Sequence, residues 1–85
     1  MPSEQRIKQA IYRSWHRGCK ETDILLGDFA RANLFSFNDE KFALYEEFIA
    51  ENDWDLYGWV IGNIETPNRY KDLIREIKNF SFKDN

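Results

Sequence analysis

The residues with the most chemical potential lie in one short segment, His16-Arg17-Gly18-Cys19-Lys20-Glu21. Histidine and cysteine bind metal ions, and a histidine can also activate a cysteine as a nucleophile. A structural zinc site needs four ligands, usually Cys and His, whereas this chain has one of each. A helix that ends before Cys19 would disfavour its thiolate, and no third group stands ready to orient His16. We therefore predict no metal site and no catalytic residue here, and place His16 at the surface near a helix end.

Other catalytic motifs are missing from the sequence. There is no glycine-rich phosphate loop, no serine nucleophile elbow and no dinucleotide-binding fingerprint. Carboxylates are plentiful, but helix caps and solvated helix faces account for most of them. We expect a protein that is not an enzyme, and keep a small enzyme that uses Cys19 as an alternative.

The same segment fits two other interpretations. In the first, Arg17 complements the C-terminus of one helix, Gly18 caps that helix in a left-handed conformation, and Glu21 complements the N-terminus of the next. In the second, the turn lies against a partner protein, to which Arg17 offers a bidentate donor and Glu21 an acceptor. Spacing alone favours the first interpretation.

Helical spacing of apolar residues places this segment between two helices. The first begins after an N-cap at Ser3, carries Glu4 in its first turn and ends at Gly18. The second runs from about residue 21 to residue 32 and stops at Asn33. The residues expected to be buried on the two helices are Ile7, Ala10, Ile11, Trp15, Ile24, Leu25 and Phe29.

Three further helices follow in the sequence. Asn38 or Asp39 caps the third, Asp53 caps a short fourth that ends at Gly62-Asn63, and Thr66-Pro67 starts the fifth. Their expected buried residues are Phe42, Tyr45, Phe48, Ile49, Leu56, Trp59, Val60, Tyr70, Leu73, Ile74 and Ile77. No segment alternates long enough with period two to be a strand. We therefore predict an all-α fold, a compact bundle of about five short helices.

Length and charge exclude several classes of protein. The chain has 85 residues, enough for one domain, which we place at 1–85 with a frayed tail at 81–85. Lys+Arg total 12 against Asp+Glu 15, and this net charge of −3 argues against nucleic acid as a partner. Apolar runs are short, so we expect no membrane insertion. The first residues show no secretory signal, and a lone cysteine suits a reducing compartment, so we expect a soluble intracellular protein.

The three tryptophans differ in what their positions predict. Trp59 and Trp15 recur at helical spacing with other apolar residues, and we expect them in the core. Trp54 falls at the first helical position after the Asp53 cap, where we expect partial exposure. Such a tryptophan is either a contact anchor for a partner or packs at the edge of the core.

Two segments of the chain resemble motifs of one protein family. Arg17-Gly18-x-x-Glu21, followed by Asp23 and an apolar stretch, resembles the Arg-Gly-x-x-Glu signature of the SdhE family. The segment Asp53-Trp54-Asp55-Leu56-Tyr57-Gly58-Trp59 resembles the family's Asp-x-Asp-Leu-aromatic-x-Trp segment. Length, acidity, helix order and the spacing of the motifs also fit, so the resemblance covers nearly the whole chain.

The resemblance implies a fold and a function. SdhE proteins are small all-α bundles that assist covalent attachment of FAD to a histidine of the flavoprotein subunit of succinate dehydrogenase and, in some bacteria, of fumarate reductase. The flavoprotein forms the bond itself, so the resemblance implies an assembly chaperone that is not an enzyme. It would bind no cofactor tightly, since FAD is the cofactor of its partner. By position, Arg17, Gly18 and Glu21 would contact the immature flavoprotein.

Further residues carry weaker expectations. We expect His16, Lys20 and Trp54 to form a second tier of partner contacts, and the free protein to be a monomer. Asp53 and Asp55 also match family positions, but we assign them to the fold, as a helix cap and a dipole partner.

The sequence departs from the family pattern in places that affect partner contacts. Thr22 stands where the family commonly carries an apolar residue, His16 where many members have a second arginine, and Trp54 where proline is frequent. The alternative function is a generic helical adaptor that binds other proteins through the Trp54 surface and has no connection with flavin. The expected location is the bacterial cytoplasm, or the mitochondrial matrix if the chain is a processed mature form.

Overall fold

The computed structural model describes residues 2–18 and 20–81 as an assembly of helices and turns. Five α-helices and two 3-10 helices make up its regular structure, and the described residues contain no strand. The predicted all-α class and the number of helices are therefore confirmed. The elements are α1 (Glu4–Trp15), α2 (Lys20–Asn33), η1 (Leu34–Ser36), α3 (Asp39–Ile49), α4 (Asp53–Ile61), η2 (Asn68–Tyr70) and α5 (Lys71–Ser81).

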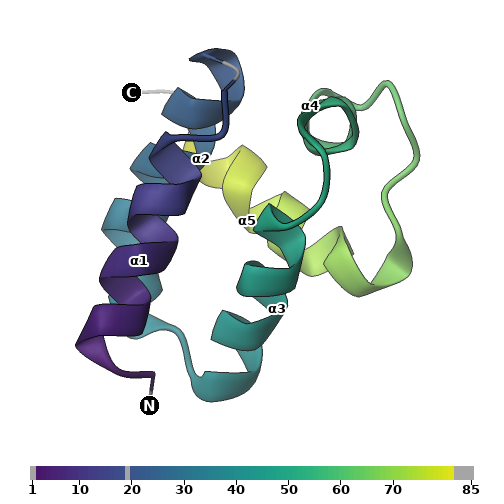
Figure 1. Ribbon diagram of the computed structural model, residues 1–85. Coiled ribbons are helices and arrows are strands. Elements are labelled where there is room, and N and C mark those ends of the chain that lie inside the picture. Colours follow the sequence, from purple (N-terminus) through teal and green to yellow (C-terminus); the bar gives the residue numbers. More distant parts are fainter. Residues whose placement is uncertain (1, 19, 82–85) are drawn as a thin grey trace.

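The helices pack around one core. In Figure 1, α1 and α2 run antiparallel as a pair at the left, α3 stands beside α1, and α4 is seen end-on at the upper right. The α5 helix crosses behind α3, and a long connection at the right of the view joins it to α4. The Cα radius of gyration is 12.0 Å. No described helix has the length and apolar content needed to cross a membrane.

Side-chain caps define where the helices begin. The Ser3 hydroxyl accepts from the Arg6 amide at 3.2 Å, and the Asn38 side chain accepts from the Lys41 amide at 2.8 Å. The first bond confirms the predicted cap of α1, and the second shows that Asn38, not Asp39, caps α3.

The predicted cap of α4 is wrong by one residue. Asn52 is the N-cap, and its side chain accepts from the Asp55 amide at 2.9 Å. The Asn52 amide group also donates to the Asp55 carboxylate at 2.9 Å, a second bond that an acceptor-only carboxylate could not supply. Asp53 is thereby the first residue of α4, and Trp54 is the second.

Two glycines with positive φ follow α1 and α4. Gly62, with a φ of 87°, ends α4 as predicted. Gly18 also has a left-handed φ, 105°, but α1 ends earlier, at Trp15. The C-cap is His16, whose amide donates to the Arg13 carbonyl at 3.3 Å. Gly18 therefore shapes the turn between the helices, and the prediction that it caps α1 is wrong.

The predicted start of α5 is also wrong. Pro67 has an extended ψ of 144° and makes no side-chain cap, so Thr66-Pro67 does not open the α-helix. The chain first forms η2, in which the Tyr70 amide donates to the Pro67 carbonyl at 3.0 Å, and α5 begins at Lys71. Residues 82–85 of the predicted frayed tail lie outside the described residues, and residue 81 is the last of α5.

Aromatic rings form the centre of the core. Phe48 of α3 lies 5.3 Å from Tyr70 and 6.1 Å from Trp59 of α4, measured between ring centroids. Burial of each such side chain contributes about 1.5–3 kcal/mol, so these contacts fasten α3, α4 and η2 together. The prediction of buried residues on the last three α-helices and η2 is confirmed for Phe42, Tyr45, Phe48, Ile49, Leu56, Trp59, Val60, Tyr70, Leu73, Ile74 and Ile77.

The α2 helix is rotated relative to the prediction. Phe29 is buried as expected, but Ile24 is 47% exposed and Leu26 takes the buried position. The cause is Gly27, which faces α1 so closely that an added Cβ would lie 2.3 Å from the Trp15 ring. With Gly27 turned toward α1, Ile24 points away from the core and Trp15 is only partly buried.

Candidate functional site

Arg17 lies between three elements of the fold. Its Nε donates to Oδ1 of Asp53 at 2.7 Å, and its terminal nitrogens donate to the carbonyls of Ile49 and Glu51. These carbonyls belong to the end of α3 and the connection to α4, while Asp53 opens α4. The sequence predicted that Arg17 complements the C-terminus of α1. In the structure it complements the C-terminus of α3 instead. Contact of its guanidinium with a partner stays a prediction.

Gly18 brings the turn close to the start of α4. Its backbone φ is 105°, a value that residues other than glycine rarely adopt. A Cβ added at this position would lie 4.0 Å from Oδ2 of Asp53. Gly18 itself is exposed, so its backbone is accessible beside the Asp53 carboxylate.

Glu21 lines a hollow formed by α2, α4 and Phe80 of α5. The hollow has a volume of about 460 Å³ and an apolar floor, and its lining residues are Glu21, Ile24, Leu25, Asp28, Tyr57, Ile61 and Phe80. Glu21 also borders a second hollow together with Asp53, Trp54 and Tyr57. Glu21 and Tyr57 line both hollows, so the two hollows are neighbours.

Trp54 is the most exposed large apolar side chain among the described residues, at 83%. Tyr57 and Ile61 follow it at helical spacing on the outer side of α4, and both are exposed. We call the surface formed by Glu21, Ile24, Trp54, Tyr57, Ile61 and Phe80 the α2–α4 face. Clustered exposed apolar side chains of this kind are typical of interaction sites.

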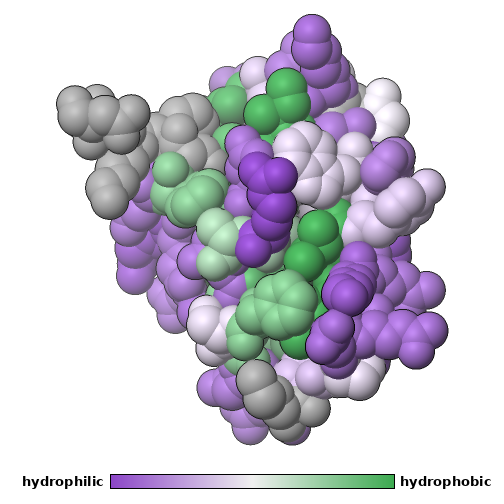
Figure 2. Space-filling model, turned by 90° about the vertical axis from the view of Figure 1, so that its left-hand side faces the viewer, coloured by the Kyte–Doolittle hydropathy of each residue, from purple (hydrophilic) through white to green (hydrophobic). Residues whose placement is uncertain are grey.

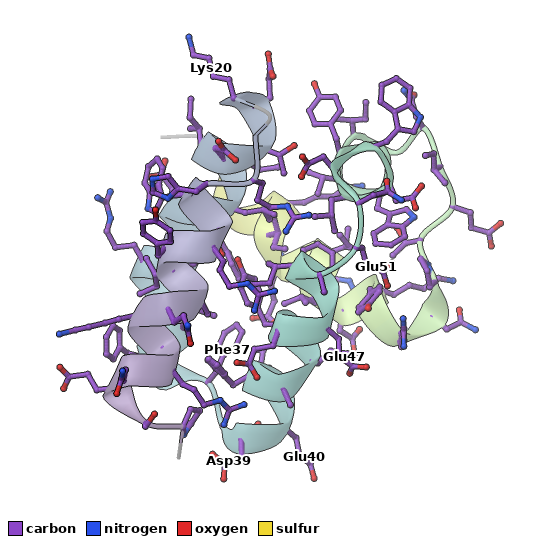
Figure 3. All side chains as sticks on the ribbon, viewed as in Figure 1. Lys20, Phe37, Asp39, Glu40, Glu47 and Glu51 are labelled. Atoms are coloured by element: carbon purple, nitrogen blue, oxygen red, sulfur yellow. The ribbon has the colours of Figure 1, made fainter. Side chains whose placement is uncertain are left out.

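His16 and Lys20 flank the turn and are both exposed. The His16 ring stacks on Tyr12 with centroids 4.0 Å apart, and its Nδ1 lies 2.8 Å from the Tyr12 carbonyl oxygen. Lys20 is the first residue of α2, and its side chain points away from the molecule (Figure 3). The structure thus groups all six predicted contact residues around the turn and the start of α4.

Comparison with known proteins identifies the family. A family model described as flavinator of succinate dehydrogenase matches residues 8–81. The chain belongs to this family.

Relatives of the flavinator family carry names that agree with one another. Succinate dehydrogenase assembly factor 2-B, mitochondrial, of Drosophila mojavensis is 41% identical over 78 residues, 89% of this chain and 50% of that protein. The assembly factor 2 of Candida glabrata is 36% identical over 83 residues, 92% of this chain and 54% of that protein. That of Saccharomyces cerevisiae is 34% identical over 85 residues, 94% of this chain and 52% of that protein. The chain spans about half the length of the curated relatives it matches.

The two motifs that carry the family resemblance meet in the structure. Arg17 from the first motif pairs with Asp53 from the second, 36 residues further along the chain. The assignment of Asp55 to the fold agrees with its bonds to Asn52. Asp53 supports the fold as well, but through Arg17 and not as a helix cap.

Thr22 shows the consequence of a departure from the flavinator pattern. The residue is 1% exposed, and its hydroxyl has no hydrogen-bond partner among the described residues. An apolar residue would fill this buried position without leaving a polar group unpaired.

Metal binding and nucleophilic catalysis are the two kinds of chemistry considered for His16 and Cys19. Cys19, on which the alternative of a small enzyme depends, lies outside the described residues. Within residues 2–18 and 20–81, no three His, Cys, Asp or Glu side chains gather in a way that could hold a metal ion.

Sequence reasoning missed part of the α2–α4 face. Tyr57, Ile61 and Phe80 were not singled out, and Ile24 was assigned to the core. The signal was present on α4, because Trp54, Tyr57 and Ile61 recur at i, i+3 and i+7 and form a second apolar stripe opposite the buried one. By contrast, the side of the molecule formed by α1 and α2 shows apolar side chains interrupted by hydrophilic ones (Figure 2).

Proposed function

We propose that this protein is an assembly factor that binds the immature flavoprotein subunit of succinate dehydrogenase and promotes covalent attachment of FAD to it. Membership of the flavinator family supports the assembly role. The observation that carries the binding role is the α2–α4 face, an exposed apolar surface bordered by Glu21 of the signature. Related fumarate reductases are a further expected client.

The protein acts in this proposal without supplying a reacting group. Covalent attachment requires the flavin and the target histidine of the flavoprotein to be held in a reactive geometry. Ordering two reacting groups can lower a barrier by several kcal/mol. A small helical protein that binds one conformation of the flavoprotein shifts its population toward that geometry. FAD is the cofactor of the partner, and we propose that this chain does not hold it tightly.

The proposed contacts follow the arrangement around the turn. Gly18 presents open backbone, Glu21 offers a carboxylate at the rim, and Trp54 provides an apolar anchor of the kind that dominates many interfaces. His16 and Lys20 extend the surface at its edge. The relatives are named mitochondrial, which supports the mitochondrial alternative over the bacterial cytoplasm as the site of action.

The test is co-expression with the cognate succinate dehydrogenase flavoprotein in cells that lack their own assembly factor. Covalent flavin is read as fluorescence of the flavoprotein band on a denaturing gel. We expect fluorescence with this chain and little with Glu21→Ala. Fluorescence no stronger than in the empty control would contradict the proposal.

A matched control is available on α3. Glu40 is an exposed glutamate in the first turn of its helix, as Glu21 is in the first turn of α2. It lies at the end of the molecule opposite Lys20 (Figure 3). Glu40→Ala should leave flavinylation unchanged. If the chain captures other proteins through the Trp54 surface without any gain in flavin fluorescence, the adaptor function is favoured instead.

A further inference from the structure

The guanidinium of Arg17 is occupied inside its own chain. The side chain is 13% exposed, and donors at all three of its nitrogens bond to the Asp53 carboxylate and the carbonyls of Ile49 and Glu51. An arginine has five N–H donors and no acceptor, and three of these donors are used here on a side chain that is largely buried, so little is left to offer a partner. This holds although Arg17 is part of the segment expected to meet the flavoprotein.

The backbone of Arg17 is tied to α2 as firmly as its side chain is tied to α4. The Arg17 amide donates to Oδ1 of Asp23 at 2.7 Å, and Asp23 lies in the first turn of α2. A chain of bonds therefore runs from Asp23 through Arg17 to Asp53, joining the first turn of α2 to the first turn of α4. The same two turns carry Glu21 and Trp54, which border one hollow.

We infer that Arg17 is a positioning residue, which fixes Glu21 on α2 relative to Trp54 on α4 and does not itself touch the partner. The inference rests on the proposed function, because it concerns how the α2–α4 face is held in a shape that the flavoprotein recognises. It also explains why the two motifs occur together. Asp53 of the second motif is the counterpart that Arg17 of the first requires.

A double-mutant cycle separates positioning from direct contact. The affinity for the purified flavoprotein subunit is measured for the parent, Arg17→Ala, Asp53→Ala and the double variant, at a temperature where each is folded. If Arg17 acts through Asp53, each single variant binds about tenfold more weakly and the double variant binds no more weakly than the worse single one. If Arg17→Ala weakens binding by the same factor with and without Asp53, Arg17 contacts the partner and the inference is wrong.

A second measurement needs no partner. In NMR spectra of the free protein, Arg17→Ala should shift the Trp54 indole and Glu21 amide signals, while signals from α1 and the middle of α3 stay in place. Mere loss of stability would leave the folded-state signals where they are in the parent. Unshifted Trp54 and Glu21 signals would overturn the inference. Failure of the parent to bind the flavoprotein, with these shifts present, would instead overturn the proposed function.

Two further variants distinguish positioning by Arg17 from a direct charge contact with the partner. Arg17→Lys keeps the charge but cannot reach Asp53 and both carbonyls at once, so it should behave like Arg17→Ala. Recovery of parental affinity in Arg17→Lys would point to a direct charge contact and contradict the inference. Arg13→Ala removes an exposed positive charge from the last turn of α1, and it should leave affinity and the Trp54 signal unchanged.

Discussion

The α3 and α4 helices begin with the same pair of residues, an asparagine cap followed by an aspartate, yet the two starts differ in their surroundings. Asn38 accepts from the Lys41 amide at 2.8 Å and Asn52 from the Asp55 amide at 2.9 Å, so capping is alike. The following aspartates differ. Asp53 pairs with Arg17 from a distant turn, while Asp39 lies near Arg6 at the surface.

The comparison separates what is local from what is long-range. A cap needs only residues three positions apart, and both helices have one. Around the α3 start, the pKa of Arg6 is raised by its hydrogen bond to Glu46 and, less strongly, by the charge of Asp39. At the start of α4, Arg17 connects Asp53 to α2, and the next residue along the helix is the exposed Trp54. Only the second start is thereby built into a candidate binding surface.

The largest expected effect concerns the core contact that joins the last turns of the two helices, away from their N-terminal starts. Phe48→Ala removes a fully buried ring that packs on Trp59 and Tyr70, and should lower the free energy of unfolding by about 3–5 kcal/mol. Chemical denaturation gives the value. A loss below about 1 kcal/mol would mean that the Arg17 bonds, and not the core, hold α4 on α3.

The caps themselves provide the most direct test of the comparison. Asn38→Ala and Asn52→Ala should each lower the free energy of unfolding by about 1 kcal/mol, because each removes one helix cap. Only Asn52→Ala should also weaken binding to the flavoprotein subunit, since it disturbs the start of α4. Equal effects on binding, measured with the same purified subunit, would show that the two starts are equivalent.

High pH should act on the joint between α3 and α4. Burial, supported by the hydrogen bond to Glu51 at 2.9 Å, raises the pKa of Tyr70 to about 12. A raised folded-state pKa means that stability is complete below about pH 10 and is lost as the pH rises toward 12. Burial raises the pKa of Tyr45 as well, so both tyrosines contribute to the loss.

The matching variant is Tyr70→Phe. At pH 11 the parent should have lost on the order of 1 kcal/mol through Tyr70, and the variant should not show this share of the loss. The free energy of unfolding at pH 8 and pH 11 gives the difference. An identical pH dependence in both proteins would rule out Tyr70 as an alkaline-sensitive contact.

The smallest effect on stability is expected for Trp54. Because the side chain is 83% exposed, Trp54→Ala should change the free energy of unfolding by less than about 0.5 kcal/mol. Phe35→Ala, at an exposed aromatic residue outside the α2–α4 face, is the matched control. Only Trp54→Ala should weaken flavoprotein binding. If both variants bind alike, the α4 start is not a contact.

The sequence predicted the fold to the extent that local patterns determine it. Ser3 and Asn38 act within three residues of themselves, and the buried residues of α3 and α4 follow one clear apolar stripe. The prediction that Thr66-Pro67 starts the fifth α-helix is wrong, because the chain first forms a 3-10 turn that ends at the buried Tyr70. The exposure of Ile24 could not be predicted from the sequence. It follows from the packing of Gly27 against Trp15, which sets how α2 is rotated about its own axis.

The candidate site was predicted in its members but not in its arrangement. Arg17, Gly18 and Glu21 were marked by the resemblance, and the structure gathers them near Trp54. The side-chain bonds of Arg17 reach residues 32 to 36 positions away, so no local spacing could reveal them. The role of Asp53 was missed for the same reason.

The hydroxyl of Thr22, which has no hydrogen-bond partner among the described residues, bears on how much sequence change this chain can absorb. A buried hydroxyl without a partner costs about 1–3 kcal/mol, so Thr22→Val, which has nearly the same shape, should stabilise the protein. Proteins tolerate destabilising substitutions only while they remain above a stability threshold. A chain with valine at this position therefore gains mutational tolerance, and could accept replacements on the α2–α4 face that unfold the present sequence.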